Sequence, residues 1–266
     1  MPELDASLLS GRAFVRTEGD FVSLYFAPGS VQSRMSITRP FALELPYTRT
    51  MMAFLLAQGN PQHILMVGLG GGSLAKFCHR HLPEARITVV EIDPDVIALR
   101  QDFQVPEDSA RFTVVCADAA DYLRQTTLVF DAILVDGFDV HGQAAALTGR
   151  RFFEDCFRAL CPQGILVTNL DADHPAHAVF VDRVEQVFAG HVLGMDVPER
   201  SNHVLFAGKD LALSSRCMSL SQALGRRSVD AQTQLKTEFQ RILAILDGRE
   251  PLLVGPTTPR SPLLLV

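Results

Sequence analysis

The sequence lacks the features of a membrane or secreted protein. No apolar run approaches the roughly 20 residues that a membrane-spanning helix needs, and no signal-peptide core follows the acidic residues Glu3 and Asp5. The five cysteines are odd in number and form no C-x-x-C pair, which argues against a disulfide framework. We therefore expect a cytoplasmic protein without a membrane partner, in which Cys78, Cys116 and Cys156 are buried free thiols.

A surplus of positive charge is also absent. The formal net charge is -6, so a nucleic-acid partner is not expected. The sequence shows no internal repeat, and no Ser-His-Asp or Cys-His arrangement can be argued from its spacing. Asp171, Asp173, His174 and His177 carry metal-ligating groups, but Pro175 interrupts regular helical spacing between them. We expect a loop that caps the next helix there, and no metal site.

Apolar segments of two kinds alternate through the centre of the chain. Hydrophobic residues make up 47% of the 266, enough for a substantial core in one large domain. Strands are predicted at residues 63–67, 86–91, 111–116, 131–135, 163–169, 191–197 and 203–207. Helices are predicted at residues 47–58, 73–82, 94–103, 118–125, 150–160 and 176–189. Since fully apolar strands such as residues 132–135 are typical of a parallel sheet covered on both faces, we expect a doubly wound, mostly parallel α/β fold.

The two ends of the chain differ from this central part. Short strand-like pieces between residues 11 and 45, separated by turn signals, predict a small antiparallel β unit. Near the other end, Leu235 and Phe239 lie on the apolar stripe of a helix predicted over residues 228–247, and a Pro-rich tail follows. We therefore divide the chain into an N-terminal β-hairpin unit (1–50), a central α/β domain (51–208) and a C-terminal helix and tail (209–266).

A glycine-rich turn joins the first central strand to its helix. Gly68, Gly70 and Gly72 have the G-x-G-x-G spacing, and Glu91 ends the next strand about 20 residues later. Glycine lets a ligand approach the backbone closely, and the following helix N-terminus offers free N–H groups. A carboxylate at this distance is where a nucleoside-binding βαβ unit holds the ribose hydroxyls. The motif predicts a nucleoside site, with a ligand-free structural turn as the alternative.

Acidic residues follow the ends of the next two predicted strands. Asp118 comes after the third strand, and Asp136 and Asp139 come after the fourth. Doubly wound sheets bind ligands outside the carboxyl ends of their strands. Asp118 precedes a helix directly, so an N-cap role stays open for it. Two carboxylates beside an apolar strand favour a functional role for Asp136 and Asp139.

Six matches in order give the chain a family resemblance from about Leu24 to Leu170, over half its length. They are Val31–Gln32, the glycine loop from Gly68 to Gly72, the Val-Glu-Ile-Asp of residues 90–93, Asp118–Ala119, the Asp-containing segment 130–139, and Phe152–Phe153 followed by residues 160–164. This order resembles the spermidine synthases, also called polyamine aminopropyltransferases. The resemblance implies the class I fold of AdoMet-dependent transferases, with decarboxylated S-adenosylmethionine as the family's donor and a small-molecule amine as acceptor. It also implies an enzyme of polyamine biosynthesis and, as an expectation for its assembly, a homodimer.

The resemblance assigns roles to individual residues. Asp136 would deprotonate the attacking amine, Asp139 would help to bind it, and Tyr47 would complete the catalytic group. Donor binding would involve the following residues: Gln32, Gly68, Gly70, Gly72, Glu91, Asp118 and Ala119. Within that set, Glu91 would take the ribose hydroxyls and Asp118 the adenine amino group. No metal is implied.

Two departures from the family pattern affect the choice of donor. Gly71 stands where the family's glycine loop usually carries an aspartate, and Arg49 stands in place of the glutamate of its Tyr-His-Glu. If both face the site, it should be more positive and tolerate intact S-adenosylmethionine. Methyl transfer and a catalytically silent nucleoside-binding or dimeric homologue are therefore alternatives. A nicotinamide oxidoreductase is less favoured, because Ser73 replaces the third small residue of G-x-G-x-x-G.

Overall fold

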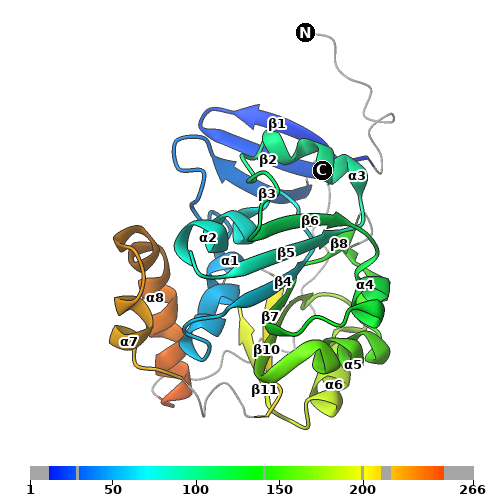
Figure 1. Ribbon diagram of the computed structural model, residues 1–266, viewed down its shortest axis with the longest axis vertical. Coiled ribbons are helices and arrows are strands. Elements are labelled where there is room, and N and C mark those ends of the chain that lie inside the picture. Colours follow the sequence, from blue (N-terminus) through cyan, green and yellow to red (C-terminus); the bar gives the residue numbers. More distant parts are fainter. Residues whose placement is uncertain (1–11, 28–29, 140–141, 199–200, 211–216, 249–266) are drawn as a thin grey trace, which may run out of the picture.

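The computed structural model describes residues 12–27, 30–139, 142–198, 201–210 and 217–248. Its first part is a three-stranded antiparallel sheet in the order β1 (Phe14–Glu18), β2 (Phe21–Ala27) and β3 (Ser30–Ser36). Figure 1 shows this sheet lying beyond the β6 edge of the larger central sheet. The predicted antiparallel β unit is confirmed, and the three-part division of the chain stays a prediction.

The central sheet has seven strands and is mostly parallel, as predicted. Its order is β11 (Val192–Asp196), β12 (Asn202–Gly208), β10 (Leu160–Asp171), β7 (Phe130–Val135), β4 (His63–Val67), β5 (Arg86–Glu91) and β6 (Phe112–Cys116). Strands β6, β5, β4, β7 and β10 pair in parallel. β12 runs antiparallel to both β10 and β11. Chain order reverses direction between β4 and β7, the position where doubly wound sheets bind ligands.

Alternate side chains of each strand enter one of two hydrophobic cores. Ile64 and Met66 join a core with α1 (Pro46–Met51), η2 (Met52–Leu56), α2 (Ser73–His81) and α8 (Val229–Leu246). Leu65 and Val67 join the opposite core with α4 (Ala119–Gln125), α5 (Arg150–Ala159) and α6 (His177–Val187). Figure 1 shows α8 and α4–α6 on opposite sides of the sheet. Burial on both faces explains why the strands read as continuous apolar runs.

The elements that the sequence did not predict are short. They are β8 (Phe138–Asp139), β9 (Gly142–Gln143), η4 (Ala145–Leu147) and α7 (Leu220–Gly225). The helix predicted over residues 94–103 is shorter, because α3 (Pro94–Ala98) gives way to η3 (Leu99–Gln101). Gln104 then takes a φ of 52°, in the left-handed region that ends a helix. The tail predicted over residues 255–266 lies outside the described residues.

The predicted burial of three cysteine thiols is confirmed for two of them. Cys78 and Cys156 are buried and Cys116 is exposed, so the expectation for Cys116 is wrong. Burial raises the pKa of the Cys78 thiol to about 12.

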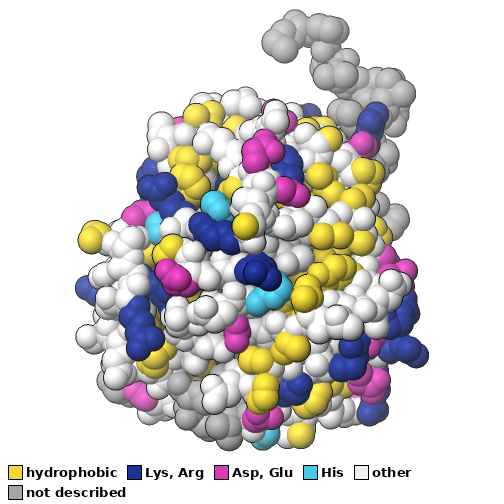
Figure 2. Space-filling view, in the orientation of Figure 1, with side chains coloured by type: hydrophobic (Ala, Val, Ile, Leu, Met, Phe, Trp, Pro, Cys, Tyr) yellow, Lys and Arg dark blue, Asp and Glu magenta, His cyan; other side chains and the backbone are white. Residues whose placement is uncertain are grey.

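On the face drawn in Figure 2, Lys and Arg side chains are interspersed with acidic ones. Within the described ranges, no helix has the length and apolar character needed to span a membrane.

Candidate active site

A cavity of about 530 Å³ opens at the carboxyl ends of the parallel strands. It is closed from one side by Leu24, Phe26, Val31 and Gln32 of the N-terminal sheet. The cavity brings together every residue that the sequence proposed for the site except Gly72, namely Gln32, Tyr47, Gly68, Gly70, Glu91, Asp118, Ala119, Asp136 and Asp139. Side chains separated by more than 100 residues therefore share one compartment.

The glycine loop after β4 packs tightly on the end of β7. Gly68 has a φ of 93°, and a Cβ there would overlap the carbonyl oxygen of Asp136. Glycine is needed for that close approach, so the loop and Asp136 are held together. Gly72, with a φ of 68°, is the N-cap of α2. It faces Val105 outside the cavity lining, so the structure places it in the loop rather than at the ligand.

Glu91, at the end of β5, is a buried acid that anchors this loop. Its Oε2 accepts from the backbone N–H of Leu69 at 2.7 Å, and its Oε1 accepts from that of Asp93 at 2.9 Å. A carboxylate has about four lone-pair sites, so each oxygen can take one further donor. Glu91 can therefore hold the loop and two hydroxyl groups of a ligand at once.

Asp118 is the N-cap of α4, which was the alternative left open for it. Its Oδ1 accepts from the backbone N–H groups of Ala120 at 2.7 Å and Asp121 at 3.1 Å. Both contacts end on the same oxygen, and Asp118 also lines the cavity beside Ala119. The capping role fixes the side chain while leaving Oδ2 to meet a donor in the cavity. The structural and ligand-binding interpretations are thus compatible.

Asp136 is held on both oxygens by neighbours from other elements. The Tyr47 hydroxyl donates to Oδ2 at 2.9 Å, and the Asn169 Nδ2 donates to Oδ1 at 2.9 Å. Burial raises the pKa of Asp136 above its usual value, and the two hydrogen bonds oppose that shift. Burial beside Asp136 also keeps the pKa of Tyr47 well above its usual value, so Tyr47 remains a donor. The result is a fixed carboxylate with enhanced proton affinity.

Asp139 and Gln32 also face the cavity, from separate elements. Asp139 ends β8, a two-residue strand paired with β9, and its side chain is exposed. Its position at the rim suits contact with a ligand that enters from solvent. Gln32 lies on β3 of the N-terminal sheet, so that sheet contributes a polar group to the site.

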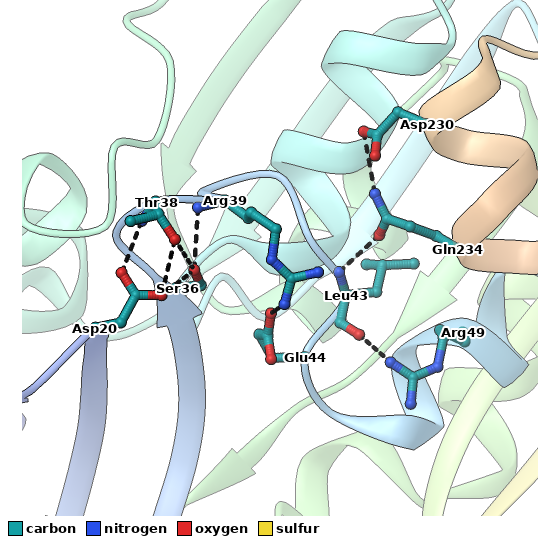
Figure 3. Close-up of polar contacts among 9 residues, drawn as sticks. All are labelled: Asp20, Ser36, Thr38, Arg39, Leu43, Glu44, Arg49, Asp230 and Gln234. Atoms are coloured by element: carbon teal, nitrogen blue, oxygen red, sulfur yellow. Dashed lines mark hydrogen bonds and ion pairs between the residues drawn. The ribbon is translucent and has the colours of Figure 1, made fainter.

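Arg49 does not line the cavity. Its Nη1 donates to the carbonyl oxygen of Leu43, and the Leu43 N–H donates to Gln234 Oε1 at 2.9 Å. Figure 3 shows these bonds fastening the segment before α1 to α8. The condition under which Arg49 would place a cation beside the acceptor path is therefore not met. Arg49 instead secures the segment that leads into Tyr47, which lines the cavity.

Gly71 does not line the cavity either. A Cβ on Gly71 would lie 2.6 Å from Ser33 Oγ and 2.8 Å from Phe103 Cδ1. Phe103 is almost fully buried, with 1% of its surface exposed. A carboxylate at this position would displace that ring or Ser33. Ser33 and Phe103 thus occupy the space into which a side chain at position 71 would extend.

The charge in the cavity has one sign. Among the lining residues that the structure describes, four are acidic and none is Lys, Arg or His. The more positive site, expected if Arg49 and Gly71 both faced the cavity, is therefore not found among these lining residues. A compartment of this kind favours cationic ligands and disfavours a free carboxylate.

Two cavity residues, Asn169 and Asn202, were not anticipated from the sequence. Asn169 lies near the end of β10, and Asn202 begins β12. A polar residue at the end of an apolar strand was the available signal for Asn169, as it was for the acids. Asn202 carried no such signal, because its place depends on the antiparallel pairing of β12 with β10. Among the described residues, those of the cavity included, no group of three or more His, Cys, Asp or Glu side chains is placed to hold a metal ion.

Comparison with known proteins agrees with this geometry. Residues 44–189 match the model of the spermine/spermidine synthase domain. A polyamine aminopropyltransferase from Chromobacterium violaceum is 39% identical over 90% of this chain and 87% of its own length. Two solved structures share the fold. A probable spermidine synthase from Corynebacterium glutamicum has a TM-score of 0.66 and 23% identity, covering 80% of this chain and 82% of its own.

The second structure is a spermidine synthase in complex with the transition-state analogue AdoDATO. It has a TM-score of 0.62 and 18% identity, covering 85% of this chain and 89% of its own. The family model spans more than half of the sequence, and the curated relative matches nearly all of it. The chain therefore belongs to the spermine/spermidine synthase family.

Proposed function

We propose that this protein is an aminopropyltransferase of polyamine biosynthesis, which moves the aminopropyl group of decarboxylated S-adenosylmethionine to an amine. The observation that carries the proposal is the acidic cavity, in which Asp136 is held by Tyr47 and Asn169. Membership of the family and the aminopropyltransferase named among its relatives support it. A homodimer and a cytoplasmic location stay predictions.

The adenosine part of the donor would lie along the ends of β4, β5 and β6. We assign the ribose hydroxyls to Glu91 and the adenine amino group to Asp118 Oδ2, with Ala119 packing nearby. Gly68 and Gly70 line this part of the cavity, so the loop backbone would face the donor there. Gln32 would contact the donor from the N-terminal sheet.

The acceptor chemistry requires a base, because an amine with a pKa of about 10 arrives protonated and has no free lone pair. Asp136 attracts the ammonium and takes its proton. The amine lone pair then attacks the carbon bound to the sulfonium. A C–N bond forms, the C–S bond breaks, and its electron pair neutralises sulfur, releasing methylthioadenosine. Asp139 at the cavity rim would help to bind the acceptor.

Product analysis tests this function. The protein would be incubated with each donor, decarboxylated or intact S-adenosylmethionine, and with a set of primary amines that includes putrescine. We expect amine-dependent release of methylthioadenosine from the decarboxylated donor, and no release when the amine is omitted. Formation of S-adenosylhomocysteine from the intact donor, with no methylthioadenosine from the other, would instead establish methyl transfer.

A further inference from the structure

Asn202 lines the cavity although it belongs to β12, which runs antiparallel to its neighbours. It is the first residue of β12 and pairs with Asp171, the last residue of β10. Because β12 runs opposite to β10, its beginning lies where the parallel strands end. Asn202 therefore lines the same cavity as Asn169, from a neighbouring strand.

A directed chain of hydrogen bonds leads from Asn202 to the base. Asn202 Nδ2 donates to Asn169 Oδ1 at 3.1 Å, and Asn169 Nδ2 donates to Asp136 Oδ1 at 2.9 Å. An ionised carboxylate can only accept, so Asn169 must present its NH₂ group to Asp136. Its carbonyl oxygen then faces Asn202, which must in turn present an NH₂ group.

Because Asn169 is buried, the orientation of its amide group affects Asp136. Asn169 is 1% exposed, so neither end of its amide can exchange its partner for bulk water at low cost. If the Asn169 side-chain amide were flipped, its carbonyl oxygen would face the Asp136 carboxylate, and two acceptors would lie opposite each other. The proton affinity of Asp136 would then rise, because a hydrogen bond to its charged form would be lost.

We propose that Asn202 is a positioning residue for Asp136, acting by fixing the orientation of the Asn169 amide. The proposal rests on the function proposed for Asp136. It extends the catalytic group to a strand that contributes no direct contact to the base among the hydrogen bonds described.

Other titratable groups line this cavity and are left unsubstituted in the test. They are Tyr47 on α1, Glu91 at the end of β5, Asp118 before α4 and Asp139 on β8. His203, the next residue on β12, shares a hydrogen bond of 2.8 Å with His177 of α6. The Asn202→Ala variant adds no charge beside any of these groups.

The test uses Asn202→Asp and Asn202→Ala in the full chain. Asn202→Asp replaces the donor by a group that accepts only, so the Asn169 amide should turn towards it. We expect kcat to fall by about tenfold, the acidic limb of the kcat/KM profile to move to higher pH, and donor affinity to change less than about twofold. Asn202→Ala, which removes the donor without reversing it, should give a smaller fall of about threefold.

A double-mutant cycle with Asn169→Ala separates the relay from the field of the new charge. In the Asn169→Ala background, both substitutions at position 202 should have no further effect on kcat. An undiminished effect there would overturn the proposal, as would wild-type kcat and pH profiles for both single variants. The Asn202→Ala arm decides the matter even if Asn202→Asp does not fold. Wild-type turnover of Asp136→Asn would refute the proposed function itself, a separate outcome.

Discussion

Asp136→Asn is expected to lower turnover by about 10²-fold or more, the usual scale for a positioned acid–base group. The amide matches the carboxylate in shape but cannot take a proton from the acceptor amine. Donor affinity should stay within about twofold, because the adenosine contacts that we propose are on Glu91 and Asp118, not on Asp136. Steady-state rates of methylthioadenosine release and calorimetry with the donor measure the two quantities.

Asp182→Asn provides the matched control. Asp182 is an exposed acid on α6 that accepts from Gln186 Nε2 at 2.7 Å, and it does not line the cavity. It should turn over at the wild-type rate. If Asp136→Asn did the same, Asp136 would be structural and the transfer mechanism would be wrong.

Asp136→Asn should not reduce the stability of the folded protein at neutral pH. The pKa of Asp136 is raised in the folded protein, so folding binds its proton more tightly than the unfolded chain does. Its contribution to stability is present below the unfolded pKa of about 3.9 and is lost as the pH rises through the pKa of the folded protein. At pH 7 the ionised group therefore opposes folding. A variant that is inactive yet has an undiminished Tm would show that activity was lost without unfolding.

Glu91→Gln is expected to weaken binding of the donor by about 2–3 kcal/mol, roughly 30- to 150-fold. The amide retains one accepting oxygen, whereas Glu91 accepts from Leu69 and Asp93 and has capacity for the ribose hydroxyls. We prefer Gln to Ala because Ala would leave both backbone N–H groups without a partner and loosen the loop. Calorimetric titration with methylthioadenosine isolates the nucleoside contact.

Glu107→Gln is the control for that titration, since Glu107 is exposed and lies outside the cavity lining. Its affinity should equal that of the wild type. An unchanged affinity in Glu91→Gln would remove the ribose assignment, although the hold of Glu91 on the glycine loop would still stand.

Much of the fold could be predicted because its signals are local. Apolar strands, a glycine turn and acids at strand ends are each contained in a few consecutive residues. The small β8–β9 pair was missed because strands of two residues carry no periodicity, and α7 is likewise short. Their positions are set by the turns and packing around them.

The errors at the site concern the direction of side chains. Arg49 and Gly71 occupy positions that line the site in the family pattern. Here the Arg49 guanidinium instead donates to Leu43, and Gly71 packs against Phe103. Sequence position does not determine which side of a short helix or loop faces a cavity. Asn169 and Asn202 meet only through the pairing of β10 with β12, which no local pattern specifies.

The central claim, that this acidic cavity selects a wholly cationic donor, is tested most directly by calorimetric titration with decarboxylated and intact S-adenosylmethionine. The two differ by one carboxylate, which would meet Asp136 or Asp139 and no cation among the described lining residues. We expect the decarboxylated donor to bind at least about tenfold more tightly, a difference of roughly 1.4 kcal/mol. Equal affinities, or tighter binding of the intact donor, would contradict the account.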